Sequence, residues 1–322
     1  MSGKSGSGGE TRGGVALTNL DQPLFEGADA VKRDLIDYLD AVSGRMLPHL
    51  AGRPLSVIRV LRGQEAFMQK NLPKYAPEWV PRAAMWAESS GREVVYALCD
   101  DRRTLLWFGN QRAVEYHPAL FLAERPEHPT HLVLDLDPPS ADAFDLAVRA
   151  AHLVRQALAD AGLAGTVKTS GAKGLHVFVP VEADATHEDV AAATRALAAR
   201  AERLDPVLTT TAYIREDRGG RVLLDTSRAG GATVVAAYSP RLRPGLPVSF
   251  PVAWADLDDV RPADFTIRTV PALIADRDPW ADAMPPPSRL PTDLIEEGRT
   301  IPTARVQAMH EGKRRARARR EG

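Results

Sequence analysis

The stretch His131–Asp137 constrains the fold of this chain more than any other, because apolar and acidic residues alternate along it. With a side-chain period of two, its three leucines point to one face of a strand, and Asp135 and Asp137 point to the other. At about 3.3 Å per residue, the two carboxylates lie about 6.5–7 Å apart along the backbone. The stretch therefore predicts an apolar strand that carries an acidic pair. Because two such carboxylates repel each other, we expect a cationic group between them.

An Asp-x-Asp pair is compatible with several chemistries. Side chains that converge from this spacing can share two divalent cations about 3.5–4 Å apart, as in two-metal phosphoryl transfer. The same pair occurs in phosphatases with an aspartyl nucleophile and in metal-dependent glycosyltransferases, and an arbitrary pair is more often a solvated strand end. Here the acids end an apolar strand, a position at which open α/β sheets bind ligands. The apolar run Arg221–Asp225 also ends in an acid, so Asp225 is the expected third ligand, with a turn aspartate as the equally weighted alternative.

A second signal is the glycine-flanked turn Ser170–Gly174, which lies between two strand-like runs. Backbone amides of such a turn and the Lys173 ammonium group are suited to phosphate oxygens. The turn is not a Walker loop, because the spacing differs and a strand follows it instead of a helix. His176 lies on that following strand and becomes a candidate for a phosphate or metal contact.

Composition bounds the class of protein. The 322 residues suffice for one large or two ordinary domains, and no apolar run approaches the ~20 residues that span a bilayer. A Gly/Ser-rich start without an apolar signal core predicts a flexible leader and a cytoplasmic location. The single cysteine, Cys99, excludes an internal disulfide and predicts core packing. The net charge of −1 argues against a uniformly basic protein, although a basic patch occurs near the end: Lys313, Arg314, Arg315, Arg317, Arg319 and Arg320.

The pattern of elements predicts an α/β (α+β) fold with a mixed central sheet and helices packed on one face. Helices are expected at 29–47, 105–117, 140–160 and 187–204, and strands at 55–60, 94–98, 131–137, 166–169, 175–179, 221–225 and 233–238. The expected organisation is a leader at 1–14, one domain at 15–285 and a flexible, Pro-rich and then basic tail at 286–322. Within the domain we expect an α/β portion at about 15–125 and a catalytic portion at about 130–250.

Three motifs in order carry a resemblance to a known family. They are Leu-Asp-Leu-Asp-Pro, Thr-Ser-Gly-x-Lys-Gly-Leu-His-Val, and a strand ending in Asp followed by Tyr-Ser-x-Arg. Over roughly residues 15–280 the chain resembles the polymerase domain of bacterial ligase D, in the archaeo-eukaryotic primase superfamily, in a stand-alone form. The resemblance implies a primase-polymerase fold with an RRM-like catalytic portion.

The resemblance also implies an activity and partners. It implies a template-directed nucleotidyltransferase that fills short gaps or extends ends in DNA repair, incorporates ribonucleotides readily and uses two Mn²⁺ or Mg²⁺ ions. The implied partners are gapped, nicked or end DNA, nucleoside triphosphates, and the end-binding protein Ku with a separate DNA ligase. The implied metal ligands are Asp135, Asp137 and Asp225; the nucleotide contacts are His117, Ser170, Lys173, Gly174, His176, Arg218, Arg228 and Arg241; the DNA contacts are Asn19, Lys32, Phe67 and Lys70.

The chain departs from the family pattern at four positions, none of them a metal ligand. Gln22 replaces a frequent lysine of the pocket for a downstream 5′-phosphate. Met68 follows Phe67 where relatives often have a second aromatic residue, so template stacking rests on Phe67. Ala172 and Ala229 replace a frequent Gly or Ser and a frequent Asn.

Two other classes of function remain open from the residues: an aspartyl-phosphate phosphatase or a nucleotidyltransferase that acts on small molecules, and a protein that only binds DNA ends. A phosphatase would usually show Asp-x-Asp-Gly-Thr, whereas Pro138 and Pro139 follow the acids here. A DNA-end binding scaffold with lapsed activity would not need the three acids, and binding without primer extension would identify it.

Overall fold

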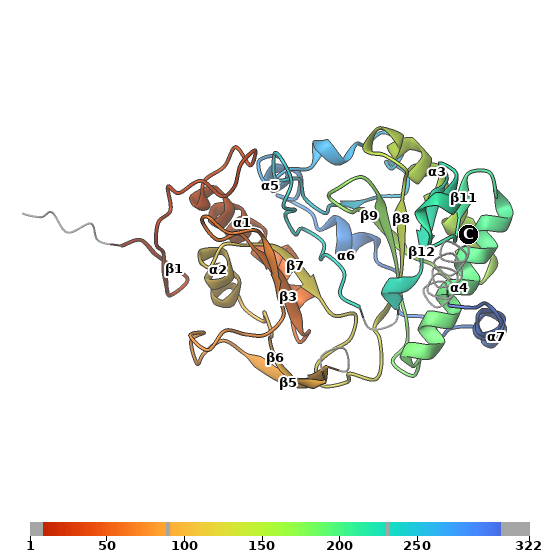
Figure 1. Ribbon diagram of the computed structural model, residues 1–322, viewed down its shortest axis with the longest axis horizontal. Coiled ribbons are helices and arrows are strands. Elements are labelled where there is room, and N and C mark those ends of the chain that lie inside the picture. Colours follow the sequence, from red (N-terminus) through yellow and green to blue (C-terminus); the bar gives the residue numbers. More distant parts are fainter. Residues whose placement is uncertain (1–8, 88–90, 230–231, 304–322) are drawn as a thin grey trace, which may run out of the picture. The chain divides into compact units, whose positions relative to one another are not determined.

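The computed structural model describes residues 9–87, 91–229 and 232–303, which form two compact units (Figure 1). Unit 1 contains Met1–Pro118, Val235–Val248 and Phe265–Asp276. Unit 2 contains Ala119–Val234, Ser249–Asp264 and Arg277–Gly322. The chain therefore crosses between the units several times, so neither unit is a single continuous segment.

Unit 2 is built on one six-stranded sheet in the order β11-β12-β8-β10-β9-β13. Its four central strands alternate with two helices along the chain: β8 (His131–Asp137), α3 (Phe144–Asp160), β9 (Thr166–Thr169), β10 (Leu175–Pro180), α4 (His187–Leu204) and β12 (Val222–Asp225). Neighbours among these strands are antiparallel. This is the order of two interleaved β-α-β units. The predicted mixed sheet with an RRM-like portion is confirmed.

Short elements complete unit 2. The edge strands are β11 (Thr209–Thr210), parallel to β12, and β13 (Pro251–Val252), antiparallel to β9. Single-turn helices are η1 (Ala141–Ala143), η2 (Arg215–Arg218), η3 (Ser227–Ala229) and η4 (Pro262–Asp264), and the last helices are α6 (Pro279–Ala283) and α7 (Thr292–Thr300).

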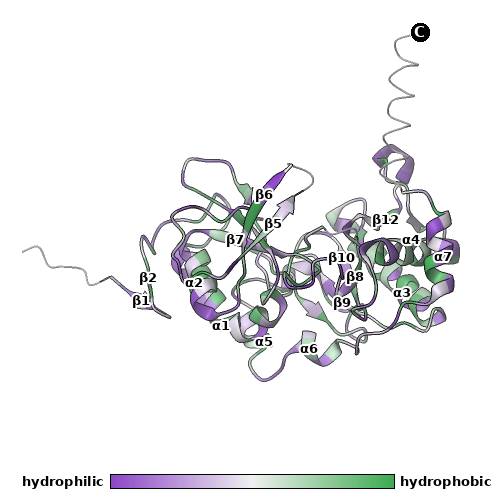
Figure 2. Cartoon of the chain, turned by 90° about the horizontal axis from the view of Figure 1, so that it is seen from below, coloured by the Kyte–Doolittle hydropathy of each residue, from purple (hydrophilic) through white to green (hydrophobic). Residues whose placement is uncertain are grey.

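Helices α3 and α4 cover one face of the sheet because each carries an alanine-rich apolar side (Figures 1 and 2). Both contact β8, and they contact each other. Helix α4 begins with a capping box, in which Thr186 Oγ1 accepts the Asp189 N–H while Asp189 accepts the Thr186 N–H. The three leucines of β8 are fully buried. This packing leaves the acidic side of β8 on the opposite face.

Helix α7 packs against α4, although residues 286–322 were expected to be a flexible tail. A Cβ at Gly298 would lie 1.8 Å from the Ala192 carbonyl oxygen, so only glycine permits this close approach. Ion pairs join Arg200 and Arg203 to Glu297 at 2.6 and 2.8 Å. Residues 292–300 therefore belong to the packed structure of unit 2. The predicted basic patch at 313–320 lies outside the described residues.

Unit 1 contains a second sheet, in which β3 (Leu55–Arg59) pairs with β4 (Phe67–Gln69), β6 (Arg92–Ala97) and β7 (Ala113–Pro118), and β5 (Arg82–Ala87) pairs with β6. The helices are α1 (Lys32–Leu50), α2 (Arg102–Asn110) and α5 (Val270–Leu273). Helices α1 and α2 pack on each other and on β7, with Leu35, Ile36 and Leu39 fully buried. Cys99 is also fully buried, which confirms its predicted place in the core.

Two element predictions were wrong. Residues 105–117 do not form one helix: α2 ends at Asn110, Arg112 adopts a left-handed conformation (φ 62°), and β7 follows. Strand β7 alternates Val114 and Tyr116 with Glu115 and His117, but it begins only three residues after α2 ends, so the two elements were merged into one. Residues 233–238 form only an isolated bridge at Thr233, and the backbone turns at Tyr238 (φ 65°), where the predicted strand would end.

The N-terminal boundaries also differ from the expectation. Residues Thr11–Arg12 (β1) and Val15–Ala16 (β2) pair as a hairpin, although 1–14 were expected to be a flexible leader. Glu10 holds Arg12 and Arg33 in ion pairs of 2.7 and 2.6 Å. Helix α1 begins at Lys32 and not at residue 29, because Asp29 adopts a positive φ of 49°.

Candidate functional site

Four charged or polar side chains form one row across the unit 2 sheet. Asp225 lies directly opposite Asp135, Asp135 opposite His176, and His176 opposite Lys168. Residues directly opposite on antiparallel strands share a face. Asp137, two residues after Asp135, lies on the same face. The structure thus brings the three predicted acids together on the face that α3 and α4 leave open.

Asp135 is buried, and nitrogen groups of His176 and Arg228 lie beside its two carboxylate oxygens. His176 Nε2 lies 3.3 Å from one carboxylate oxygen and Arg228 Nε lies 3.5 Å from the other. Burial raises the pKa of Asp135, but His176, Arg228 and Lys168 outweigh burial and lower it to about 2. Asp135 is therefore ionised throughout the neutral range.

Lys168 is a member of this row that the sequence did not single out. Its side chain is fully buried, and Nζ lies 2.8 Å from His176 Nδ1 and 2.6 Å from the Ser249 hydroxyl. An ammonium group has only donors, so His176 Nδ1 accepts and the proton on Nε2 faces Asp135. Lys168 thereby fixes the ring orientation of His176. Lys168 could have been identified by its register with His176 and Asp135. That register cannot be derived without knowing which strands are neighbours in the sheet.

The second acid of the pair has a different environment. Lys173 Nζ lies 3.9 Å from Asp137. Burial and the neighbouring carboxylates of Asp135 and Asp225 raise the pKa of Asp137, against the opposing effect of Lys173. Arg218 also opposes this rise, while its guanidinium donates to the Ala212 and Tyr213 carbonyls.

These acids fit a divalent cation by charge and by donor type. Carboxylate oxygens are the ligands that Mg²⁺ and Mn²⁺ prefer, and the mutual repulsion that raises the pKa of Asp137 is what a bound cation relieves. Among the residues that the structure describes, no three His, Cys, Asp or Glu side chains already converge as a metal-binding group. The cations now beside Asp135 and Asp137 are Arg228 and Lys173, as the expected charge balance requires.

The turn Ser170–Gly174 is stabilised by hydrogen bonds between its own residues. The Ser170 hydroxyl accepts hydrogen bonds from the amides of Ala172 and Gly174 at 3.2 and 3.1 Å. These two amides were expected to be available to phosphate oxygens, but in the structure they are bonded within the turn. A Cβ at Gly174 would lie 2.1 Å from the Leu136 carbonyl oxygen. Gly174 is thus required for the turn to approach β8, and Lys173 Nζ donates to the Pro138 carbonyl at 2.6 Å.

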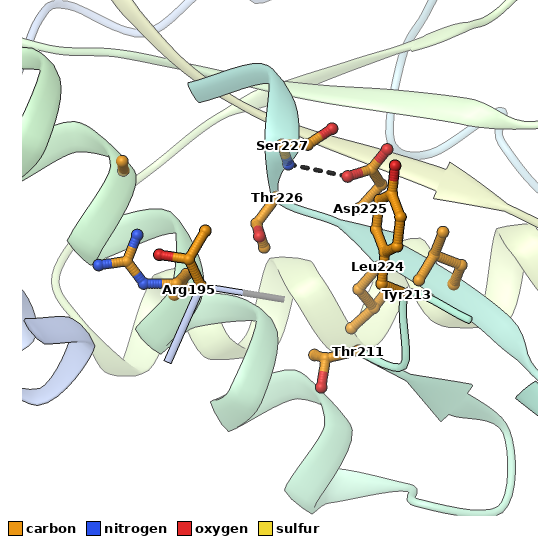
Figure 3. A pocket seen from close by; sticks show the side chains of 10 residues that line it. Arg195, Thr211, Tyr213, Leu224, Asp225, Thr226 and Ser227 are labelled. Atoms are coloured by element: carbon orange, nitrogen blue, oxygen red, sulfur yellow. Dashed lines mark hydrogen bonds between the residues drawn. The ribbon is translucent and has the colours of Figure 1, made fainter. Parts of the chain in front are cut away.

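A pocket of about 110 Å³ lies beside the third acid (Figure 3). Asp225 lines it together with Arg195 of α4 and with hydroxyl-bearing and apolar side chains, among them Thr211, Tyr213, Leu224 and Thr226. The Ser227 N–H donates to Asp225 at 2.8 Å, which fixes one carboxylate oxygen (Figure 3). Asp225, at one end of the acidic row, therefore also borders a pocket.

Unit 1 contains its own buried charged cluster. Glu115 and His117 lie two residues apart on one face of β7, with His117 Nε2 2.8 Å from the Glu115 carboxylate. Arg241 Nε lies 3.1 Å from the same carboxylate, and the Leu242 N–H donates to it at 2.8 Å. Burial raises the pKa of Glu115, but His117, Arg241 and the Leu242 amide lower it to about 2. Glu115, which the sequence did not single out, thus joins the predicted residues His117 and Arg241.

The predicted DNA contacts fall on other parts of unit 1. Asn19 adopts a left-handed conformation (φ 52°) in the turn before α1, and its carbonyl accepts the Gln22 amide. Lys32 is buried at the start of α1, where Nζ donates to the Thr18 carbonyl at 2.5 Å. Burial and the neighbouring Arg112 lower the pKa of Lys32 to about 8. Phe67 on β4 and Lys70 just beyond it are exposed.

The helices in the described part of the chain include none that is both long and apolar enough to cross a bilayer.

Comparison with known families agrees with this architecture. The model of the family described as LigD, primase-polymerase domain, matches residues 31–280. The bifunctional non-homologous end joining protein LigD of Bacillus subtilis is 36% identical over 261 residues, which are 80% of this chain and 42% of that protein. The multifunctional non-homologous end joining DNA repair protein LigD of Mycobacterium tuberculosis is 37% identical over 265 residues, 79% of this chain and 34% of that protein. The chain thus spans less than half the length of these relatives.

A solved structure is also similar. The polymerase domain from Mycobacterium tuberculosis ligase D, in complex with DNA, superposes with a TM-score of 0.75 and 33% sequence identity. The match covers 82% of this chain and 95% of the solved chain.

Proposed function

Because the chain belongs to the LigD primase-polymerase domain family, we propose that it is a template-directed nucleotidyltransferase that fills short gaps or extends ends during DNA break repair. The observation that carries this proposal is the row of Asp225, Asp135, His176 and Lys168, with Asp137 on the same face. The relatives' names place them in non-homologous end joining, and the similar solved chain is a polymerase domain bound to DNA.

The proposed reaction is in-line attack by a primer 3′-hydroxyl on the α-phosphorus of a nucleoside triphosphate. The 3′-oxygen to phosphorus bond forms, and the bond to the pyrophosphate leaving group breaks. Asp135, Asp137 and Asp225 would hold two Mn²⁺ or Mg²⁺ ions. When bound, such ions lower the pKa of the attacking hydroxyl and stabilise the charge of the leaving group.

The chain's own cations have a separate part in this proposal. Lys173 lies beside Asp137 and Arg228 beside Asp135, and their positive charges would offset the negative charge of a triphosphate. Lys168 orients the His176 ring, so that its Nε2 proton stays directed at Asp135. In unit 1, Glu115 fixes His117 and Arg241 as a preformed pair for nucleotide contacts. Ser170, Gly174 and Arg218 are further proposed contacts or supports for the nucleotide.

Primer extension on gapped DNA tests the proposal. We expect extension by the wild-type chain with Mn²⁺, loss of extension in the double variant Asp135→Ala, Asp137→Ala, and normal extension in Asp142→Asn. Asp142 is an exposed acid of η1 and serves as the matched control. If the double variant still extends primers, the proposed mechanism is wrong. Binding of DNA by the wild-type chain without any extension would favour the end-binding scaffold.

The finer parts of the proposal are tested in the same assay. Ribo- and deoxynucleotides, Mn²⁺ and Mg²⁺, and gaps with and without a 5′-phosphate are compared. We expect ready ribonucleotide incorporation, and weak dependence on the 5′-phosphate because Gln22 stands where relatives have a lysine. Association with Ku and a separate DNA ligase is tested by adding each to an end-joining reaction, where we expect more ligated product.

A further inference from the structure

Two exposed aromatic side chains, Phe67 and Tyr75, lie on unit 1, where they are 38% and 61% exposed. Met68, 45% exposed, follows Phe67 on β4 and points to the other face of that strand. Large side chains that cluster in solvent mark binding surfaces more often than single exposed ones do. The proposed role for Phe67 leaves Tyr75 unexplained, although Tyr75 is the more exposed of the two rings.

Arg59 connects the two aromatic residues. It lies on β3 directly opposite Phe67, and the central carbon of its guanidinium is 5.9 Å from the Phe67 ring centroid. The Nη1 atom of the same group donates to the Tyr75 hydroxyl at 2.9 Å and to Gln69 at 2.6 Å. Its Nε atom donates to the Gln111 carbonyl at 2.9 Å, which anchors the guanidinium to the backbone.

This network holds Tyr75 by its hydroxyl while its ring remains in solvent. Arg59 itself is only 6% exposed, so it is a fixed part of the framework and not a flexible surface residue. Stacking on a ring that is already oriented costs less conformational entropy than stacking on a free one. We call Arg59, Phe67 and Tyr75 the aromatic platform.

The charge around the aromatic platform indicates its partner. Residues 59–86 contain five basic and two acidic residues, whereas the whole chain has a net charge of −1. Lys70, three residues after Phe67, and Lys74, directly before Tyr75, are both exposed. Aromatic rings interleaved with exposed cations are the combination that binds single-stranded nucleic acid, through stacking on bases and attraction to phosphates. An apolar protein partner would not require this local excess of positive charge.

We propose that Tyr75 is a second base-stacking residue, which together with Phe67 binds unpaired bases of a single DNA strand. This inference rests on the proposed function, because it deepens the DNA recognition of the same enzyme. Tyr75 would supply the second aromatic face that Met68 does not provide. Arg59 acts as a positioning residue that holds both rings.

Binding of a fluorescent single-stranded oligonucleotide, followed by anisotropy without metal or nucleotide, tests the proposal. Stacking is worth about 1–3 kcal/mol per base, so we expect Tyr75→Ala to weaken binding about tenfold. Tyr75→Phe keeps the ring but loses the hydrogen bond to Arg59 that orients it, so its affinity should fall by no more than about threefold. Leu273→Ala removes an exposed apolar side chain of α5 in the same unit and leaves the affinity unchanged.

The salt dependence of binding separates stacking from phosphate contact. Lys74→Ala should reduce the slope of log affinity against log salt by about 0.7, as for one phosphate contact on a single strand. Tyr75→Ala should weaken binding with no change in slope. A strand of abasic sites offers no base to stack, so wild type and Tyr75→Ala should bind it equally. This comparison also removes any indirect effect of the substitution on folding.

Two results would overturn the proposal: equal affinity of Tyr75→Ala and wild type for the normal strand, or an equal loss on normal and abasic strands. Because the assay contains no catalytic step, its outcome is independent of primer extension. Extension without a Tyr75 effect would refute the stacking role alone, whereas a Tyr75 effect without extension would refute the proposed enzymatic function alone.

Discussion

The buried carboxylate of Glu115 should contribute strongly to the stability of unit 1. Its pKa falls from an ordinary 4.5 to about 2, since the contacts with His117, Arg241 and the Leu242 amide outweigh burial. At 1.36 kcal/mol per pKa unit, this fall corresponds to about 3 kcal/mol in favour of the folded state at pH 7. We therefore expect Glu115→Gln to lower the free energy of unfolding by about 3 kcal/mol at pH 7.

Because the pKa of Glu115 is lowered in the folded state, the direction in which this loss changes with pH can be predicted. A carboxyl with a lowered folded pKa stabilises the protein above its unfolded pKa, and this contribution disappears as pH falls from about 4.5 towards 2. The difference between wild type and Glu115→Gln should therefore shrink as the pH is lowered through that window. Urea unfolding at pH 7, 5 and 3.5, followed by tryptophan fluorescence and circular dichroism, measures it.

A matched control separates the contribution of Glu115 from the general effect of removing a negative charge. Glu65→Gln removes an exposed acid of the same unit and should change the free energy of unfolding by less than about 0.5 kcal/mol. The reasoning is refuted if Glu115→Gln costs less than about 1 kcal/mol at pH 7. It is also refuted if the loss at pH 3.5 equals the loss at pH 7.

Three further outcomes are expected. Gly298→Ala should destabilise unit 2 by about 1–3 kcal/mol in urea unfolding, because its Cβ would overlap the Ala192 carbonyl, whereas Gly44→Ala in open space should be neutral or stabilising. Gly174→Ala should disrupt the turn beside β8 and abolish primer extension, and normal extension by this variant would contradict the packing argument. Lys32 has a pKa of about 8, so the preference for 5′-phosphorylated over unphosphorylated ends should fall between pH 7 and 9. An anisotropy titration in which that ratio does not change would argue against Lys32 as a phosphate ligand.

Local patterns predicted the central elements of unit 2 well, because β8 ends in alternating apolar and acidic residues and α4 begins with a capping box. His131–Asp137 and His187–Leu204 have the predicted bounds, and the family resemblance, drawn from three motifs in order, is confirmed by the match over residues 31–280. The prediction was wrong where a strand follows a helix almost directly. Strand β7 alternates Val114 and Tyr116 with Glu115 and His117, but only two residues separate it from the end of α2, and the two elements merged in the prediction.

The row across the unit 2 sheet shows what a single sequence leaves undetermined. Alternation assigned Asp135 and His176 each to a face of its own strand, and that assignment needs only the period of two. Which side chains of different strands share a face of the sheet depends on the order β12-β8-β10-β9 and on the register of each pair of strands. A shift of one residue between β9 and β10 would place Lys168 on the opposite face and leave His176 Nδ1 without its donor. The orientation of the imidazole towards Asp135 is therefore a property of strand register, which arises from the packed sheet and not from any one segment.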